Sequence, residues 1–422
     1  MPDLKLRQLL DALHADRYPD ALRPFLPPDG PPPELEATRL QAPTCYWAVY
    51  RTGGGWITVK SFLSADAYRG YRASLERYHR DRVDRPDHPR GGITFAPDLN
   101  AVVWAFPFDP AMPELHRCVD GDWVARAWPR CRYAILIAEP VDYTPEIGAV
   151  VAYRDPERRR VVAYGKTSPK ETAGLVYLVM DRLWRSGARR EGRLRLAKPL
   201  AFRPDADFLL QTRVFGRPLE GDRNDLLFLR LARHAGEALA TVHGADIPFG
   251  PTRGLDDLRR RLADSRDELA LAAPTLVPTY RDLLDQIGQR AERSEPEPPV
   301  PSHGDFKYDQ FLRYRQQFVL IDFELFCQAE PALDLGTFCA YLPPSRPFGW
   351  RDAAAAEALR TAFLRSYESA AGWLVNPERL ALHESAMLAL RALALVWRQR
   401  PDWQQRASQM LALAMERLVS AA

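Results

Sequence analysis

One segment in the last third of the chain limits the folds open to this protein more strongly than any other part of the sequence. Residues 302–312 read SHGDFKYDQFL and residues 319–326 read VLIDFELF. Asp305 and Gln310 bracket a short loop that enters an apolar strand, and Asp322 closes the next apolar strand. Two short strands joined by a turn would bring Asp322 beside Gln310. Because hard cations such as Mg²⁺ prefer carboxylate and amide oxygens as ligands, the segment predicts a cation site there.

The same segment supplies a carboxylate for proton transfer. Asp305 would face a bound hydroxyl group and accept its proton while a phosphoryl group is transferred. Phosphoryl transfer needs one such carboxylate, together with at least two oxygen ligands that hold magnesium on ATP. The alternative is a solvent-exposed strand–turn–strand whose acidic residues have no function. It is disfavoured because acidic residues rarely recur in this spacing.

A lysine that binds nucleotide phosphates is expected upstream of this segment. Lys166 ends the strand pattern VVAYGK and stands just ahead of a helix pattern. Taken alone, a lysine that ends a strand is usually a surface charge. Together with the segment at 302–326, Lys166 becomes a candidate for holding the α and β phosphates of ATP. The helix acid that would pair with Lys166 is left open between Glu171 and Asp181.

Composition is typical of a globular protein with more than one lobe. The 422 residues exceed the size at which single cores stop growing, and 46% of them are apolar. The net charge is +3 and the basic residues are spread along the chain, which argues against nucleic acid as the main partner. The five cysteines form no CxxC pair, so reduced thiols and a cytoplasmic location are expected.

No part of the sequence is expected to direct export or to cross a membrane. Residues 1–20 predict an amphipathic helix in which acids and bases are mixed, unlike a signal peptide. No segment is predicted to be long and apolar enough to span a bilayer, since even AMLALRALALVW carries Arg391 in its middle.

Four parts are predicted along the chain. Residues 1–36 are a helix and a proline-rich linker, 37–130 a first β-rich module, 131–218 a second β-rich module, and 219–422 a mainly helical region that contains the segment described above. In each module a β-hairpin is followed by a helix, expected at 65–80 in the first module, and then by a further strand.

The two β-rich modules read as a duplication. Residues 95–112 align without a gap on residues 202–219, with identities at Phe95/Phe202, Pro97/Pro204, Asp98/Asp205 and Phe108/Phe215. Lys60 precedes the first of these phenylalanines by 35 residues, and Lys166 precedes its counterpart by 36. The first module has no catalytic segment of its own. It is therefore expected to pack on the nucleotide-binding lobe or to restrict the substrate cleft, with Lys60 at the surface.

Three motifs together resemble a known family. HGDFKYDQFL, VLIDFELF and EPALDLGTF are similar to the Brenner-type loop and metal strand of the aminoglycoside phosphotransferase and choline kinase family, over residues 133–418. The module at 37–130 is placed like the N-terminal cap of maltokinase-like bacterial phosphotransferases. The resemblance implies an α+β, bilobal protein-kinase-like fold, in which a β-rich N-lobe and a helical C-lobe are preceded by a degenerate duplicate of the N-lobe.

The resemblance also implies an activity and roles for single residues. The chain is expected to be a kinase that uses ATP and Mg²⁺ to phosphorylate a hydroxyl of a small polar molecule. Asp305 would be the catalytic base, and Gln310 and Asp322 would bind magnesium. Asp334 would support the loop, and His303 would brace the backbone near Asp322.

The nucleotide would lie between the lobes. Lys166 would hold its phosphates, and the run FLLQTRVFGRPL would form the hinge, with Arg213 and Phe215 beside the adenine. For Phe215 an ordinary core position is an equal alternative. The turn within 143–151, which contains one glycine, would cover the phosphates with its backbone amides.

The sequence departs from the family pattern at several points. Gln310 stands where the family usually has Asn, Lys307 stands where relatives often have His, and no Gly-rich loop is present. A catalytically silent, kinase-like binding protein is therefore kept as the alternative. A kinase that acts on a protein or an RNA is a third reading, against which the near-neutral charge argues.

The acceptor molecule is expected to be gripped by the C-terminal helices. Their charged residues are mixed: Glu357, Glu368, Glu378, Glu384, Arg391, Arg398 and Arg400. Such a mixture favours neither a polycation nor an anion, so a sugar or another metabolite is preferred to an antibiotic. The sequence does not predict the oligomeric state.

Overall fold

The protein is described by a computed structural model of residues 1–422. The structure describes residue 22 and residues 31–41, 45–53, 55–80, 92–219, 225–342, 353–398 and 402–420. The helix predicted at 1–20 lies outside these residues, as does Arg400.

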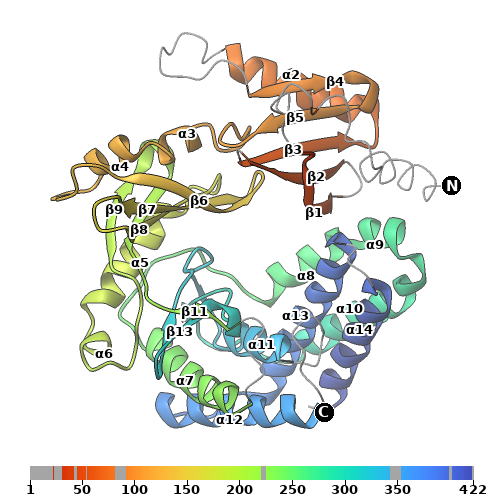
Figure 1. Ribbon diagram of the computed structural model, residues 1–422. Coiled ribbons are helices and arrows are strands. Elements are labelled where there is room, and N and C mark those ends of the chain that lie inside the picture. Colours follow the sequence, from red (N-terminus) through yellow and green to blue (C-terminus); the bar gives the residue numbers. More distant parts are fainter. Residues whose placement is uncertain are drawn as a thin grey trace.

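Two antiparallel five-stranded sheets with the same strand order form the first half of the chain (Figure 1). The first sheet has the order β1-β2-β3-β5-β4 and contains β1 (Glu34–Gln41), β2 (Cys45–Thr52), β3 (Gly55–Phe62), β4 (Ile93–Ala96) and β5 (Ala101–Ala105). The second has the order β6-β7-β8-β10-β9 and contains β6 (Ile137–Thr144), β7 (Gly148–Asp155), β8 (Arg160–Thr167), β9 (Pro199–Arg203) and β10 (Phe208–Thr212). The third strand of each sheet leads into a helix, α2 (Ala65–Arg80) or α5 (Ala173–Arg185).

The predicted hairpins are confirmed as β2–β3 and β7–β8, but the sequence reading missed the first strand of each sheet. Both missed strands, β1 and β6, lie at sheet edges, and most of their residues are exposed or half-buried. An edge strand of this kind does not need the apolar alternation on which strand prediction depends. The module boundary predicted after residue 36 falls inside β1.

The strand register shows that the two sheets are equivalent. Phe95 and Lys60 both pair with Val102 in the first sheet, and Phe202 and Lys166 both pair with Leu209 in the second. Each sheet also has a short 3₁₀ turn beginning at a proline and ending in a left-handed residue, Asn100 (φ 45°) or Asp207 (φ 38°). The repeat predicted from the sequence is therefore present in the fold.

The two sheets share an apolar core. Trp47, Val49 and Trp56 of the first sheet belong to one buried cluster with Val151 and Phe208 of the second. The short helices α3 (Leu115–Cys118) and α4 (Gly121–Ala127) connect the sheets and contribute to the same cluster. Because burial of apolar surface is the main stabilising force in folding, this shared core fixes the sheets relative to each other.

The rest of the chain is mainly helical. Its helices are α7 (Asp225–His243), α8 (Leu255–Asp264), α9 (Arg266–Ala272), α10 (Val277–Ala291), α11 (Ala332–Tyr341), α12 (Ala353–Ala371), α13 (Pro377–Arg398) and α14 (Trp403–Ser420). Its short strands are β11 (Arg217–Pro218), β12 (Val300–Ser302), β13 (Phe311–Tyr314), β14 (Gln317–Leu320) and β15 (Cys327–Ala329). A four-residue helix, α6 (Gly187–Arg190), follows α5 in the β-rich half. All five cysteines are free, as the sequence predicts.

Helix α13 corrects one expectation from the sequence. By length and composition it is apolar enough to cross a membrane, although no such segment was predicted. However, 72% of its most apolar window is buried inside the protein, where it packs in one cluster with residues of α8, α10 and α14. Among the described residues it is the single helix that passes this test, and its burial identifies it as a core helix.

A buried charged group ties α13 to the segment before α11. Glu330 accepts hydrogen bonds from the Nε and Nη2 atoms of Arg379 and from Nε2 of His383, the last at 2.8 Å. The three residues are at most 5% exposed. Burial opposes ionisation of Glu330, but the hydrogen bonds from His383 and Arg379 outweigh it and lower the pKa to about 2.

Glu330→Gln is expected to lower the free energy of unfolding by about 3–5 kcal/mol, because it leaves the buried Arg379 guanidinium without its counter-charge. Since the pKa in the folded state lies below the ordinary value of 4.5, this stabilisation is complete above about pH 4.5 and is lost as the pH falls toward 2. Urea unfolding followed by circular dichroism measures both effects. The exposed Glu295→Gln is the matched control, and equal midpoints for the two variants at pH 7 would contradict the assignment.

Candidate active site

The loop that follows β12 is held in place by a buried carboxylate at the start of α11. Asp334 accepts hydrogen bonds from the backbone N–H groups of His303 (2.6 Å) and Gly304 (2.8 Å). Gly304 has a φ of 81°, and a Cβ atom at this position would lie 1.9 Å from the carbonyl oxygen of Leu325. Glycine is therefore required there, and the loop has little freedom to move away from α11.

His303 connects this loop to the strand that leads to Asp322. Its Nε2 atom lies 3.0 Å from the carbonyl oxygen of Ile321, the residue before Asp322. The ring is fully buried and contacts the ring of Phe323 at a centroid distance of 4.8 Å. These contacts match the bracing role that the family resemblance implies for His303, and they leave proton transfer to other groups.

The hairpin predicted from the sequence forms and brings Gln310 close to Asp322. Strand β13 pairs with β14, with Phe311 opposite Leu320. The backbone N–H of Ile321 donates to the carbonyl oxygen of Gln310 at 2.9 Å, which extends the pairing by one residue at each strand. The Gln310 side chain is 7% exposed, and its Nε2 donates to Oδ2 of Asp305 at 3.0 Å. The amide oxygen of Gln310 can therefore act as a ligand while its nitrogen orients Asp305.

Two lysines reach this cluster of acids, one from each half of the protein. Lys307 lies in the loop itself, with Nζ 2.9 Å from Oδ2 of Asp305. Lys166, at the end of β8, lies 2.8 Å from Oδ1 of Asp322 and 3.1 Å from Oε1 of Glu324. Burial tends to lower the pKa of both lysines, but the neighbouring carboxylates outweigh it, so each pKa is raised above its ordinary value. Both ammonium groups are therefore charged at neutral pH.

The site carries more negative than positive charge. Four carboxylates, those of Asp305, Asp309, Asp322 and Glu324, face the two ammonium groups of Lys166 and Lys307, which leaves a formal charge of −2. Burial raises the pKa of Asp309 to about 6; Lys307 opposes this rise, and the charges of Asp305 and Asp322 add to it. A site with this charge and these oxygen atoms fits one divalent cation.

The backbone at Asp322 supports a functional role for this position. Asp322 has a φ of 72°, in the left-handed region that few residues other than glycine, asparagine and aspartate adopt readily. Among the described residues no group of three or more His, Cys, Asp or Glu side chains is arranged to hold a metal by itself. Magnesium on a nucleotide needs only one or two protein ligands, because phosphate oxygens and waters complete the shell. The assignment of Gln310 and Asp322 as the metal pair stays a prediction.

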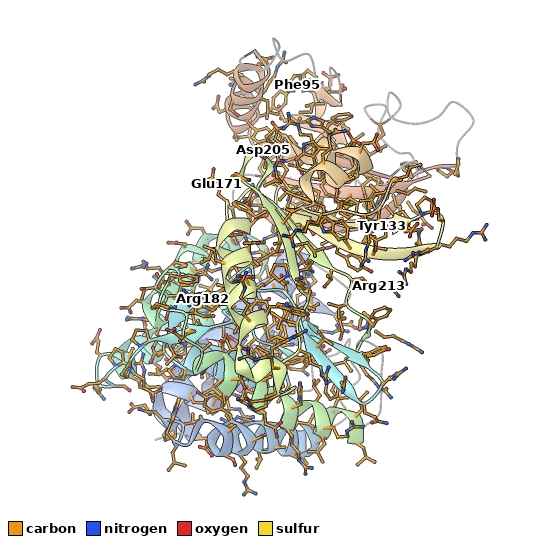
Figure 2. The ribbon with its side chains drawn as sticks, turned by 90° about the vertical axis from the view of Figure 1, so that its left-hand side faces the viewer. Phe95, Tyr133, Glu171, Arg182, Asp205 and Arg213 are labelled. Atoms are coloured by element: carbon orange, nitrogen blue, oxygen red, sulfur yellow. The ribbon has the colours of Figure 1, made fainter. Side chains whose placement is uncertain are left out.

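The partner of Lys166, which the sequence left open, is found outside α5. Glu171 lies before the first turn of α5 (Figure 2), and Asp181 forms an ion pair with Arg185 at 3.0 Å. Lys166 instead pairs with Asp322 and Glu324. Glu324 is thus a site residue that the sequence reasoning missed. Its position two residues after Asp322, in the turn that follows β14, was the available signal.

Arg213 and Phe215 are not brought together with these residues. After β10 they line a separate cavity of about 480 Å³ with Trp184, Arg195 and Tyr314, and none of the clustered carboxylates borders that cavity. The Arg213 guanidinium, labelled in Figure 2, lies 4.5 Å from the centre of the Phe215 ring, which is 54% exposed. Their assignment to the adenine stays a prediction.

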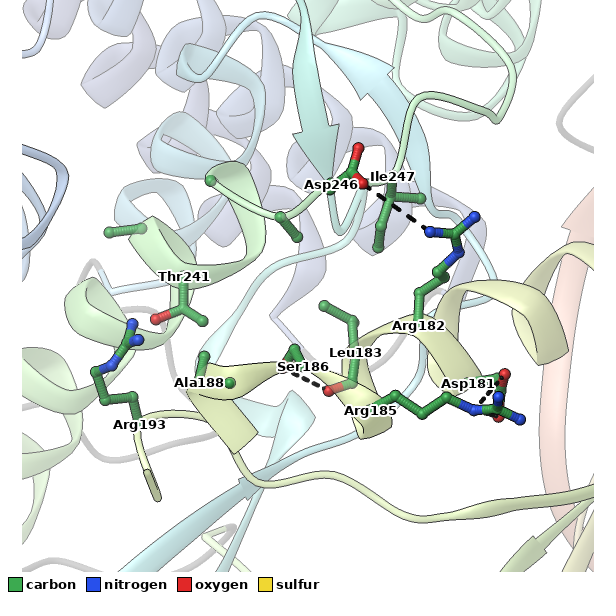
Figure 3. A pocket seen from close by; sticks show the side chains of 14 residues that line it. Asp181, Arg182, Leu183, Arg185, Ser186, Ala188, Arg193, Thr241, Asp246 and Ile247 are labelled. Atoms are coloured by element: carbon green, nitrogen blue, oxygen red, sulfur yellow. Dashed lines mark hydrogen bonds and ion pairs between the residues drawn. The ribbon is translucent and has the colours of Figure 1, made fainter. Parts of the chain in front are cut away.

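A larger cavity, of about 810 Å³, lies elsewhere, between α5, α6 and the end of α7 (Figure 3). The ion pairs at its rim, Asp181 with Arg185 and Arg182 with Asp246, involve mostly exposed side chains. None of the clustered acids or lysines lines it. The clustered residues, and not this cavity, are therefore the candidate active site.

Two solved structures illustrate what the protein is similar to. A protein from Ralstonia eutropha JMP134 assigned as an aminoglycoside phosphotransferase aligns with a TM-score of 0.53 and 17% identity, over 71% of this chain and 97% of its own. A choline/ethanolamine kinase family protein from Mesorhizobium loti aligns with a TM-score of 0.48 and 18% identity, over 74% of this chain and 98% of its own. The first of these supports the kinase-like fold.

Sequence comparison identifies the family. No curated protein gave a significant match. The family described as "Phosphotransferase enzyme family" matches residues 154–383, which is more than half of the chain and includes β8, the loop after β12 and the β13–β14 hairpin. The predicted α+β, bilobal kinase-like fold is thereby confirmed. The chain belongs to the phosphotransferase enzyme family that is typified by the aminoglycoside phosphotransferases.

Proposed function

We propose that this phosphotransferase is a kinase that uses ATP and Mg²⁺ to phosphorylate a hydroxyl group of a small polar molecule, with Asp305 as the catalytic base. One observation carries the proposal: the chain brings Asp305 and Gln310 together with Asp322 and Lys166 in a single cluster. A general base, a metal-binding pair and a phosphate-binding lysine are the parts that phosphoryl transfer requires.

The nucleotide phosphates would lie below the end of the second sheet. Val150 of β7 pairs with Lys166 of β8, so the turn between β6 and β7 lies at the same end of the sheet as the lysine. Lys166 would exchange its contacts with Asp322 and Glu324 for contacts with phosphate oxygens. Gln310 and Asp322 would hold magnesium, which when bound neutralises charge on the phosphates.

One carboxylate oxygen of Asp305, Oδ2, contacts two neighbouring side chains. Gln310 donates to Oδ2, and the ammonium group of Lys307 lies 2.9 Å from the same atom. Oδ1 is thus available to accept the proton of the acceptor hydroxyl. Lys307 and Gln310 hold the carboxylate at a fixed angle and stabilise its charge before the proton arrives.

Two acids of the C-terminal helices, Glu357 and Glu384, form ion pairs with arginines of the same region, which limits their use in binding the acceptor molecule. Glu384, whose side chain is 0% exposed, lies 3.0 Å from Arg360 and 3.1 Å from Arg417. Glu357 pairs with the same two arginines. A cationic antibiotic would have to displace these arginines in order to bind the acids, and desolvated ion pairs resist this.

The side chains close to Asp305 suit a neutral, hydroxyl-rich molecule. The centre of the Tyr341 ring lies 5.0 Å from Nζ of Lys307 and 4.6 Å from the guanidinium of Arg391. An aromatic face next to hydrogen-bond donors and the carboxylate of Asp309 is a combination that binds sugar rings. We therefore propose a sugar or a similar metabolite as the acceptor, in a cytoplasmic setting that keeps the five thiols reduced.

A panel of hydroxylated small molecules tests the proposal. Purified protein with ATP and Mg²⁺ is expected to release ADP with one or more neutral sugars or polyols, at a rate well above that with aminoglycosides or choline. Product analysis by mass spectrometry would show a gain of one phosphoryl group. Release of ADP only with cationic acceptors would overturn the acceptor class.

A catalytically silent kinase-like protein is the second candidate. The observation that favours it is that α5 offers Lys166 no acid, while Asp322 and Glu324 already neutralise the lysine. Titration calorimetry separates the two candidates, because the kinase is expected to bind ATP more tightly when Mg²⁺ is present. Nucleotide binding that does not depend on Mg²⁺, together with the absence of ADP release, would favour the silent protein.

A further inference from the structure

The sequence predicts that Lys60 of the first sheet lies at the surface. In the structure Lys60 is buried. It is 6% exposed, and its Nζ lies 2.6 Å from Oε2 of Glu146. The hydroxyl of Tyr71 in α2 donates to the other carboxylate oxygen of Glu146 at 2.6 Å. The ammonium group also lies 4.5 Å from the centre of the Tyr71 ring. Lys60 thus has a half-buried carboxylate as its partner, while its counterpart Lys166 faces the active site.

Glu146 belongs to the turn between β6 and β7. It has a φ of 57°, and its backbone N–H donates to Oδ2 of Asp109 at 2.8 Å. Asp109 is 2% exposed and also accepts a hydrogen bond from the hydroxyl of Tyr143, at the end of β6. Tyr143 accepts in turn from Nε1 of Trp104, in β5. The first module therefore holds this turn both through its backbone and through its side chain.

The opposite side of the first sheet contacts the helical half of the protein. Strand β1 packs beside α13, and Leu271 and Ala272 of α9 pack against the apolar cluster of the first sheet. The guanidinium of Arg39 in β1 lies 5.9 Å from the ring of Trp397 in α13. Figure 1 shows the first module reaching from the second sheet across to α8, α9 and α13. The first module thus contacts both the β6–β7 turn and the C-terminal helices.

We propose that the first module is a clamp, in which Lys60 and Tyr71 hold Glu146 so that the β6–β7 turn can cover the phosphates of the nucleotide. The inference rests on the proposed function. Lys60 takes the protein's own Glu146 carboxylate where its counterpart Lys166 would take a phosphate. Lys60 and Glu146 are positioning residues in this scheme, because they act on the nucleotide through the turn.

The charge of Glu146 explains why a clamp is needed. The turn has no run of glycines, and it carries a carboxylate at the end of the sheet to which Lys166 also belongs. A carboxylate released from Lys60 would repel the polyphosphate, and this repulsion is strong where water is partly excluded. Neutralisation by Lys60 and retention by Tyr71 remove the repulsion and leave the backbone of the turn to face the phosphates.

This mechanism predicts that removing Lys60 and removing Glu146 will weaken Mg·ATP binding to different extents. Lys60→Met leaves the Glu146 charge in place without its counter-ion, and is expected to weaken Mg·ATP binding by about 10-fold or more. Glu146→Gln removes the charge together with the clamp, and is expected to weaken binding by only about 3-fold. The double variant should behave like Glu146→Gln, because the repelling charge is absent. Calorimetric titration of ATP in the presence of Mg²⁺ measures the affinity of all three variants.

Hydrogen–deuterium exchange of the nucleotide-free protein tests the clamp without any turnover. Amide exchange in residues 144–148 is expected to rise by about 10-fold in Lys60→Met and in Glu146→Gln, while Lys60→Arg, which keeps the charge, restores protection. Glu139→Gln is the matched control: it breaks the ion pair with Arg154 in the same hairpin and should change neither exchange in the turn nor ATP affinity.

Two results would overturn the clamp. One is unchanged exchange in residues 144–148 after the Lys60 and Glu146 substitutions. The other is an equal loss of ATP affinity in Lys60→Met and Glu146→Gln that also appears in Glu139→Gln. A wild-type protein that binds no nucleotide at all would refute the proposed kinase function instead, and the exchange experiment would still decide whether the turn is clamped.

Discussion

Asp305→Asn is expected to lower kcat by about 10²–10⁴-fold while leaving the affinity for Mg·ATP within about 3-fold. The substituted side chain keeps the shape of the carboxylate but cannot accept the proton of the acceptor hydroxyl. The carboxylate is also the acceptor for Nε2 of Gln310 at 3.0 Å and the counter-charge of Lys307 at 2.9 Å. Steady-state ADP release with the best acceptor, together with calorimetric titration of ATP, measures the two quantities separately.

Asp246 offers a matched control for Asp305→Asn, because it lies outside the cluster of site residues. Asp246 has a side chain that is 94% exposed and lies at the cavity of Figure 3, and Asp246→Asn should leave kcat unchanged. A kcat for Asp305→Asn within 3-fold of wild type would remove Asp305 from the mechanism. A large loss of ATP affinity with the same kcat would assign Asp305 to nucleotide binding instead.

Asp322→Asn is expected to abolish most of the metal dependence of nucleotide binding, with the affinity for ATP in the presence of Mg²⁺ falling by at least about 100-fold. The variant removes the anionic oxygen that the metal pair needs, and it also removes one of the two counter-charges of Lys166. Asparagine is the appropriate replacement, because it tolerates the left-handed backbone that Asp322 adopts at φ 72°. Calorimetric titration of ATP at several Mg²⁺ concentrations gives the measurement.

Asp402→Asn serves as the control for Asp322→Asn. Asp402 also has a left-handed backbone, with a φ of 63°, but its side chain is 72% exposed and lies just before α14. The same chemical change there should alter neither thermal stability nor Mg²⁺ dependence. If Asp322→Asn retains the wild-type dependence of ATP affinity on Mg²⁺, then Gln310 and Asp322 are not the metal pair.

Several features of the site follow from residues that are close together in the sequence. The spacing of Asp305, Gln310 and Asp322 correctly predicted the β13–β14 hairpin, because the pairing of two adjacent strands depends mainly on the turn between them. The contacts of His303 and Asp334 with the same segment are also those that the family resemblance implies. The hairpins β2–β3 and β7–β8 were predicted for the same local reason.

Other features have no local signal. Edge strands β1 and β6 were missed because half-exposed strands carry little apolar alternation. Glu324 was missed although it lies two residues from Asp322, because its partner Lys166 comes from the other half of the protein. Lys60 was placed at the surface, since a lysine at the end of a strand is usually solvated, yet it is buried against Glu146.

The sequence alone predicted the chemical groups of the site other than Glu324, the hairpin that carries Gln310 and Asp322, and the duplication of the sheet. Only the tertiary structure decided which charges meet: Lys166 pairs with Asp322 across 156 residues, and Lys60 pairs with Glu146 across 86. The physical reason is that hairpins and helices arise from contacts between near neighbours in the chain. Which distant charges pair depends on how the sheets and helices pack to bury their apolar faces. The periodicity of a short segment does not indicate which other segment it packs against.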